Sequence, residues 1–167
     1  MMNLNENKLK EIDRLKKEID SYRPLDKHEL HQLKKYYRIS LAYTSNPLEG
    51  NSLTETETKI VIEDGLTIGG KPLKDHNEAV GHSKAYDLVH ELLEKSQITE
   101  ENILDIHKLF YHSIDLENAG KYRKKQVFIS GTEFVPPSPE QVTNLMKKFV
   151  ASMSMLQQKH HPVEFAA

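Results

Sequence analysis

The sequence contains no cysteine and no long apolar run, and it has almost no excess of either charge. Without cysteine there can be no disulfide framework and no thiolate metal site, which fits a cytoplasmic protein. The net charge of -2 provides no basic surface of the kind that binds nucleic acid. No segment reaches the length of a membrane span, and the N-terminus has no signal-peptide apolar core. We therefore expect a cytoplasmic protein without nucleic-acid or membrane partners.

Several motifs that carry chemistry are also missing. The nine histidines form no H-E-x-x-H pair, and no carboxylate–histidine pairing repeats between helices, so we expect surface histidines and no metal site. Gly69-Gly70 lacks the lysine and hydroxyl context of a phosphate-binding loop. No G-x-S-x-G turn is present either. These motifs therefore give no catalytic residue within the chain.

What the chain does contain is helical periodicity. A hydrophobic content of 37% and a length of 167 residues predict a globular domain with a real core. Apolar residues recur at helical spacing over residues 4–19 and from about 26 to the turn at 44–51. Further helix starts are predicted at Thr54, Asp75, Thr99 and Ser138, where a capping residue precedes an acid or amide three positions later. The fold class is predicted to be mainly α.

One segment has β character instead. Two short runs rich in β-branched and aromatic residues flank a glycine turn, which predicts a β-hairpin. The hairpin residues are Val127, Phe128, Ile129, Ser130, Gly131, Thr132, Phe134, Val135, Pro136 and Pro137. A two-stranded ribbon of this size is not stable alone and must lie against the helices. An open edge could capture an extended segment of another protein. A hairpin without a binding role is an equal alternative.

The turn Thr44–Asn51, T-S-N-P-L-E-G-N, concentrates polar groups between two helical patterns. Gly50 can adopt the left-handed conformation that closes a helix, and Asn51 also tolerates it. Glu49 is left unexplained by this role. A carboxylate at the negative end of the helix macrodipole requires a cation from elsewhere. This turn is therefore the candidate functional site.

The sequence ends on H-P-V-E-F-A-A, where a proline and an acid mark another helix start. A helix of roughly six residues is not stable by itself. We therefore expect this chain to be a truncated form of a longer protein or an incomplete gene product.

These motifs together resemble the Fic (Fido) domain family. The resemblance covers about Tyr43 to the last residue and is carried by six pieces in the same order. They are E-G-N-S-L-T-x-x-E-T, N-E-A, I-T-E-E-N-I-L-D-I-H-K-L-F, A-G-K-Y-R, V-F-I-S-G-T-x-F-x-P-P and H-P-V-E-F-A-A. It implies a helical Fic-like domain with one β-hairpin flap. Residues 1–42 then form an N-terminal helical extension, and 43–167 the N-terminal part of a Fic domain that is incomplete at its C-terminus.

The resemblance also implies roles for residues. Family members transfer AMP from ATP, with Mg²⁺, to a protein Tyr, Thr or Ser hydroxyl. Their inhibitory motif [S/T]-x-x-x-E-[G/N] matches Ser45, Glu49 and Gly50, and the hairpin matches the flap that holds the target segment. Glu49 would pair with an arginine of the catalytic motif, in competition with the ATP γ-phosphate. The catalytic motif of the family, H-P-F-x-x-G-N-G-R-x-x-R, is absent from residues 1–167.

The predicted function is therefore that of part of a Fic-family protein adenylyltransferase with an intramolecular inhibitory motif at Ser45–Gly50. We expect this chain alone to be inactive and to bind neither ATP nor Mg²⁺, because the catalytic loop supplies nearly all of the electrostatic positioning. Two alternatives remain open: an enzyme that removes AMP, and a non-catalytic helical protein-binding module. Homo-oligomer formation is also left open, because helices missing from the fold would leave a face unburied.

Overall fold

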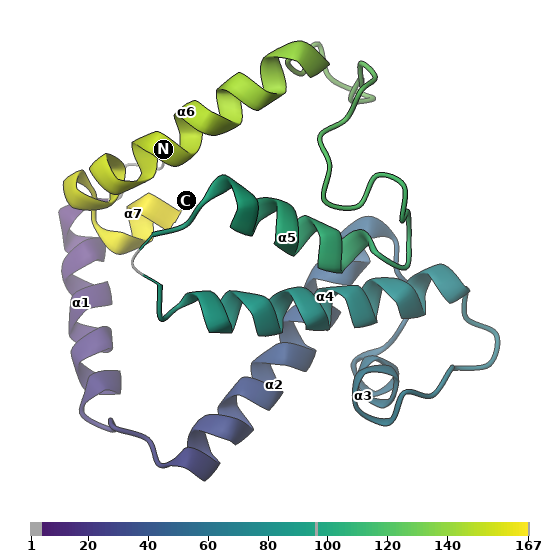
Figure 1. The fold of residues 1–167 in the computed structure, drawn as a ribbon. Coiled ribbons are helices and arrows are strands. Elements are labelled where there is room, and N and C mark those ends of the chain that lie inside the picture. The colour runs from purple at the N-terminus through teal and green to yellow at the C-terminus, as the bar shows by residue number, and fades with distance from the viewer. Residues whose placement is uncertain (1–4, 96, 167) are drawn as a thin grey trace. The chain divides into compact units, whose positions relative to one another are not determined.

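The computed structural model describes residues 5–95 and 97–166, and every regular element among them is a helix (Figure 1). The elements are α1 (Glu6–Asp20), α2 (Lys27–Ser45), the 3₁₀ helix η1 (Asn46–Glu49), α3 (Glu55–Asp64), α4 (Leu73–Leu92), α5 (Glu100–Tyr111), α6 (Pro139–Lys159) and α7 (Pro162–Ala166). The prediction of a mainly α fold is confirmed.

Helix ends follow the capping residues read from the sequence. Thr54 and Glu57 form a reciprocal capping box at the start of α3, and Thr99 forms another with Asn102 at the start of α5. Gly65 ends α3 in the left-handed conformation at a φ of 66°. These boundaries therefore follow from contacts between residues close together in the sequence.

The described residues divide into two compact units. One contains residues up to Leu33 together with those from Ala151 onward, and the other runs from Lys34 to Val150. In the first unit, His161 Nε2 lies 3.1 Å from Asp13 Oδ1 on α1. The division predicted at residue 43 stays a prediction.

Within the second unit, α4 is the central helix. It lies alongside α5 and contacts α3 and η1 near its N-terminal end (Figure 1). The buried cluster of Leu53, Val61 and Ala79 joins the segment before α3, α3 itself and α4. Two ion pairs connect α2 to this core, from Lys35 to Glu63 at 2.9 Å and from Arg38 to Asp87 at 3.0 Å. α4 therefore positions the segments on either side of it in the sequence.

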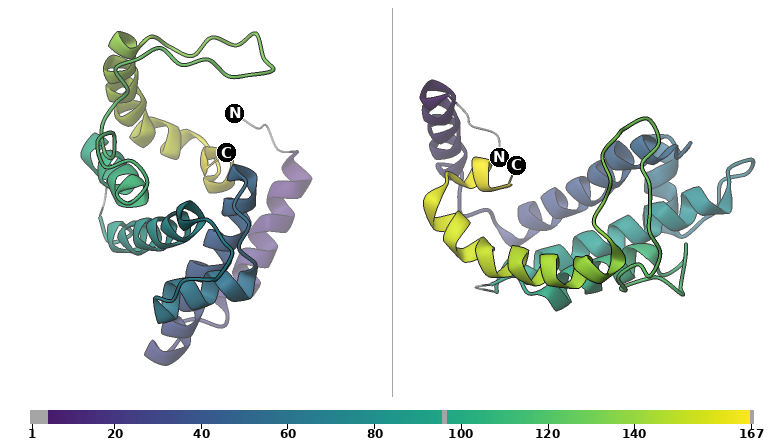
Figure 2. Two further views of the ribbon diagram at one scale, coloured as in Figure 1. Left: turned by 90° about the vertical axis from the view of Figure 1, so that its right-hand side faces the viewer. Right: turned by 90° about the horizontal axis from the view of Figure 1, so that it is seen from above.

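The predicted β-hairpin is wrong as secondary structure. Residues 124–137 form an extended loop that leaves and returns to the helical region (Figure 2), and the described part of the chain contains no strand. The turn at Ser130–Gly131 is present, with Gly131 at a φ of 79°. No backbone hydrogen bond joins the two arms of this loop. Pro136 and Pro137 lack N–H donors, so a ladder could not extend through them.

The predicted helix start at Asp75 is also wrong. α4 begins at Leu73 after Pro72, which makes no side-chain cap. Asp75 lies in the first helical turn, and its carboxylate accepts hydrogen bonds from Ser52 instead of capping its own helix. The carboxylate of Asp75 therefore bonds to a residue distant in the sequence and not to the backbone at the start of its own helix.

None of the helices among the described residues is both long and apolar enough to cross a membrane.

Gly81 allows α4 and α5 to approach closely. A Cβ added at this position would lie 2.3 Å from the Phe110 carbonyl oxygen and 3.0 Å from its carbonyl carbon. These are backbone atoms, so neither can move aside as a flexible side chain would. The helix pair is therefore held at a separation that only glycine permits.

We predict that Gly81→Ala lowers the free energy of unfolding by roughly 1–3 kcal/mol, the range for overpacking a filled interior. Denaturant unfolding followed by circular dichroism measures the change. Gly69→Ala is the matched control, because no atom lies within 4 Å of its added Cβ and its φ is not in the left-handed region. Equal stability of the two variants would contradict the close approach.

Candidate functional site at the Ser45–Asn51 turn

The turn after α2 is closed by a Schellman motif. The Gly50 N–H donates to the Pro47 carbonyl at 3.0 Å, and the Asn51 N–H donates to the Asn46 carbonyl at 3.2 Å. Gly50 has a φ of 82°, the left-handed conformation that this motif requires. The sequence prediction for Gly50 is confirmed. The element that it ends is a four-residue 3₁₀ helix that begins with Asn46 and Pro47.

Asn51 attaches this turn to α4. Its Nδ2 donates to the Asp75 carbonyl oxygen at 3.0 Å and to Glu78 Oε2 at 2.9 Å. Its Oδ1 accepts a hydrogen bond from the Leu53 N–H at 3.0 Å. Asn51 is only 8% exposed, and Glu78 is buried beside it. A buried polar side chain with all these bonds made is stabilising, whereas an unpaired one is costly.

Ser52 makes a second connection to the same turn of α4. Both its N–H and its hydroxyl donate to Asp75 Oδ2, each at 2.7 Å. Burial by itself raises the pKa of Asp75. The two hydrogen bonds from Ser52 and the charge of Lys74 outweigh that effect, so the pKa of Asp75 lies below its ordinary value. The carboxylate is therefore held in its charged form.

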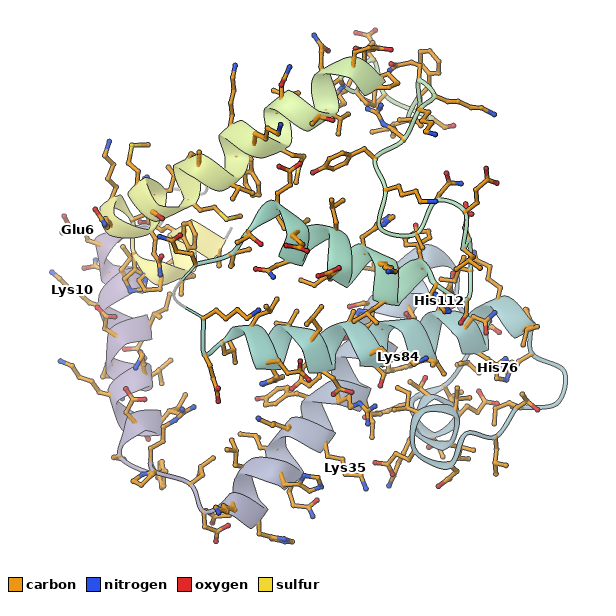
Figure 3. The ribbon with its side chains drawn as sticks, viewed as in Figure 1. Glu6, Lys10, Lys35, His76, Lys84 and His112 are labelled. Atoms are coloured by element: carbon orange, nitrogen blue, oxygen red, sulfur yellow. The ribbon has the colours of Figure 1, made fainter. Side chains whose placement is uncertain are left out.

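The loop between α3 and α4 is fixed by His76, which lies at the N-terminal end of α4 (Figure 3). Its Nε2 accepts a hydrogen bond from the Ile68 N–H at 2.8 Å, so the ring proton is on Nδ1, 2.8 Å from the Pro72 carbonyl oxygen. The Lys71 ammonium donates to the Ser52 carbonyl oxygen and lies 3.5 Å from Glu57 Oε2. Lys71 therefore connects this loop to the 45–53 segment.

The predicted inhibitory residues lie together on this turn. Ser45 is the last residue of α2, Glu49 the last residue of η1, and Gly50 its left-handed cap. The side chain of Glu49 lies outside the part of the chain that the structure describes. The neighbouring Leu48 is 86% exposed, so the tip of the turn faces away from the core. The inhibitory role of these residues stays a prediction.

The predicted target-docking residues lie on the 124–137 loop, and their apolar side chains are exposed. The exposed hydrophobic residues are Val127, Phe128, Ile129, Phe134 and Val135. The base of the loop is joined by side chains: Gln126 Nε2 donates to the Pro136 carbonyl oxygen at 3.0 Å, and the Arg123 guanidinium donates to the Pro137 carbonyl oxygen. The two ends of the loop are therefore held together while its middle stays open to solvent.

A separate hollow of about 530 Å³ lies between α4 and α5. Lys84 on α4 and His112 after α5 lie on its walls (Figure 3). The remaining lining residues are Leu88, Asp105, Lys108 and Leu109. None of the residues that anchor the 45–53 segment contributes to it, so the hollow is distinct from the candidate site.

An all-helical domain with this turn mounted on its central helix defines a Fic-like fold. Fic-1 (aa134–508) from C. elegans superimposes with a TM-score of 0.77 at 29% identity, over 95% of this chain and 46% of that one. A Fic domain-containing signaling protein from Bacteroides thetaiotaomicron gives a TM-score of 0.81 at 26% identity, over 93% of this chain and 60% of that one. The fold class implied by the sequence motifs is thus confirmed, without the hairpin.

The family follows from sequence similarity. The model of the Fic/DOC family matches residues 97–167. Protein adenylyltransferase Fic of Nematostella vectensis is 39% identical over 129 residues, which are 75% of this chain and 30% of that protein. The protein of the same name from Drosophila grimshawi is 32% identical over 83% of this chain and 29% of its own length. The chain is a Fic/DOC family protein related to protein adenylyltransferase Fic, and it spans about 30% of these relatives.

Sequence reasoning missed the connections that hold the site. The sequence predicts only that Asn51 tolerates a turn and that Asp75 caps a helix. The partners lie 23 to 27 residues apart in sequence, beyond the reach of capping or periodicity rules. The available signal was indirect: N-E-A places Glu78 on the apolar face of a helix, where a carboxylate needs a partner.

We predict that Asp75→Asn lowers the free energy of unfolding at pH 7 by roughly 1–3 kcal/mol, because it weakens both bonds from Ser52. The folded-state pKa of Asp75 is below the ordinary value of 3.8. The contribution is therefore fully present above that pH and is lost as pH falls through the folded-state pKa. Denaturant unfolding measured from pH 7 to pH 3 should show that the difference in free energy of unfolding between Asp75→Asn and the wild type becomes smaller as the pH falls. Asp105→Asn, at an exposed position on α5, is the control and should change the free energy of unfolding little at pH 7.

Proposed function

We propose that this chain carries the regulatory and target-docking parts of a protein adenylyltransferase, which transfers AMP from ATP to a protein Tyr, Thr or Ser hydroxyl. The observation that carries the proposal is the Schellman-closed turn ending in Glu49 and Gly50, mounted on the central helix of a Fic-like fold. The relatives of this chain bear the name of that activity. The catalytic signature is not among these 167 residues.

The proposed inhibitory segment is Ser45, Glu49 and Gly50. Its carboxylate would pair with a catalytic-loop arginine supplied by polypeptide outside this chain, so that the nucleotide γ-phosphate loses that partner. Bidentate pairing of a carboxylate with arginine is charge-assisted and strong enough for this competition. The hydrogen bonds from Asn51 to α4, beside this turn, support the role, because a competing group must be held in place before the phosphate arrives.

The proposed docking segment is Val127–Pro137. Its backbone is extended and forms no ladder. Side chains engage the Phe134 N–H and the carbonyls at its two ends, and the groups between them are open to pairing with an extended target segment. The exposed Phe128 and Phe134 add apolar contact area next to that backbone. These features are those expected of a surface that holds a peptide beside a reacting group.

ATP and Mg²⁺ are the nucleotide and metal expected of the complete enzyme. Residues 1–167 do not supply a site that fits these groups. Gly69-Gly70 lacks the context of a phosphate-binding loop, and the glycine–asparagine–glycine signature is absent. We therefore assign no ligand of the nucleotide or of the metal to residues 1–167.

The isolated chain should transfer no AMP. Incubation with labelled ATP and Mg²⁺, followed by gel autoradiography, tests this directly. A complete Fic enzyme in the same assay is the positive control. Robust self-labelling of the 167-residue chain would overturn the proposal, because catalysis would then come from residues that are present.

In the protein extended through its full reading frame, Glu49→Gly should raise AMP transfer by roughly tenfold to a hundredfold. That range corresponds to the 1.5–3 kcal/mol of a charged hydrogen bond. Glu55→Ala, at an exposed position in the first turn of α3, is the control and should leave the rate unchanged. If wild type instead removes AMP from a modified protein and Glu49→Gly loses that reaction, the chain belongs to a de-modifying enzyme. A reading frame without the catalytic signature would favour a binding module.

A further inference from the structure

We propose that Asn51 is a positioning residue for regulation: its side chain fixes the turn that carries Glu49 onto α4 and thereby sets the strength of inhibition. The inference rests on the proposed function for its regulatory meaning. Its structural part, that one amide side chain holds this turn, stands on the geometry alone.

Asn51 contributes to the turn through both its backbone and its side chain. Its backbone N–H closes the Schellman motif by donating to the Asn46 carbonyl at 3.2 Å. Its side chain makes three more hydrogen bonds, two of them to residues 24 and 27 positions later on α4. The same residue therefore shapes the turn and attaches it to the central helix. Any displacement of Asn51 must displace the end of η1.

Among the turn residues whose side chains the structure describes, no other makes an equivalent attachment. Pro47, Leu48 and Gly50 are exposed. Asn46 is buried, but its Nδ2 has no hydrogen-bond partner in the described structure, so this donor adds no polar connection. Ser52 is bound to Asp75, one residue further from the turn. Among the described side chains, the polar attachment closest in sequence to Glu49 is thus the Asn51 amide.

The groups around the Asn51 side chain require both a hydrogen-bond donor and an acceptor, which an amide provides. Glu78 uses one carboxylate oxygen for Lys74 Nζ, at 3.2 Å, and the other for Asn51 Nδ2. The Asp75 carbonyl is a second acceptor for Nδ2, and the Leu53 N–H is a donor for Oδ1. Aspartate at position 51 would keep the Leu53 bond, lose both donor bonds and place its charge beside Glu78. The substitution therefore changes hydrogen bonding with almost no change of volume.

The first test is hydrogen exchange of the 167-residue chain. In Asn51→Asp, amides of a peptide spanning residues 46–53 should exchange at least about tenfold faster, since two buried bonds are lost. Peptides of α5 should not change. Asn102→Asp is the matched control, because it makes the same chemical change at a capping position where an acceptor is all that the Thr99 N–H requires.

A rescue variant tests whether the hydrogen bond between positions 51 and 78, and not the identity of residue 51, protects the turn. Adding Glu78→Gln to Asn51→Asp reverses donor and acceptor, because the glutamine amide can donate to the aspartate. Protection of residues 46–53 should then be partly restored. If Asn51→Asp does not fold, Glu78→Met removes one of the two acceptors and should give a smaller, equally local increase. Unchanged exchange, or a uniform increase extending to α5, overturns the positioning role.

The second test uses the protein extended through its reading frame. Asn51→Asp should raise AMP transfer, and it should add nothing when Glu49 is already glycine, because Asn51 acts through Glu49. A residue needed only for folding would lower the rate in both backgrounds. If Glu49→Gly fails to raise transfer, the proposed function is wrong. If Glu49→Gly raises transfer and Asn51→Asp does not, this inference alone is wrong.

Discussion

The seating of residues 51–53 on the first two turns of α4 is the interaction on which the rest of the described core depends. Asn51 and Ser52 satisfy polar groups of α4 that would otherwise be buried without partners, and Leu53 enters the apolar cluster beside them. Hydrogen bonding and apolar burial thus act at adjacent residues. Because an unsatisfied buried group costs more than a made bond contributes, this arrangement strongly favours one register of the segment.

α4 can serve as the central helix because its buried residues after Glu78 are small. Ala79, Gly81 and Ala85 are buried, and they let neighbouring segments approach its backbone. The contact of Gly81 with Phe110 sets the α5 side, while Asp75 and Glu78 receive the turn on another side. A helix with bulky residues at these positions would hold its neighbours farther away. The turn that carries Glu49 therefore takes its position from the same helix that positions α5.

The 124–137 loop shows how a surface can keep binding capacity without regular structure. Its ends are tied by Gln126 and Arg123, while its prolines prevent a complete ladder. An extended segment whose backbone forms no ladder and whose aromatic rings are exposed retains the chemistry of a strand edge. The sequence signal for β structure was correct about residue type and turn position. It was wrong about pairing, because pairing requires a partner that these residues do not supply to each other.

The sequence by itself determined the helical class, most helix boundaries, and the position and closing residue of the Ser45–Gly50 turn. These properties depend on interactions within four or five residues, such as the Thr54 capping box and the left-handed Gly50, so the local order of residues encodes them. Only the tertiary structure decided that Asp75 serves Ser52 and not its own helix, and that Asn51 reaches Glu78. Partners more than twenty residues apart meet only after the helices pack, and several local arrangements of a polar side chain are close in free energy until burial removes its water.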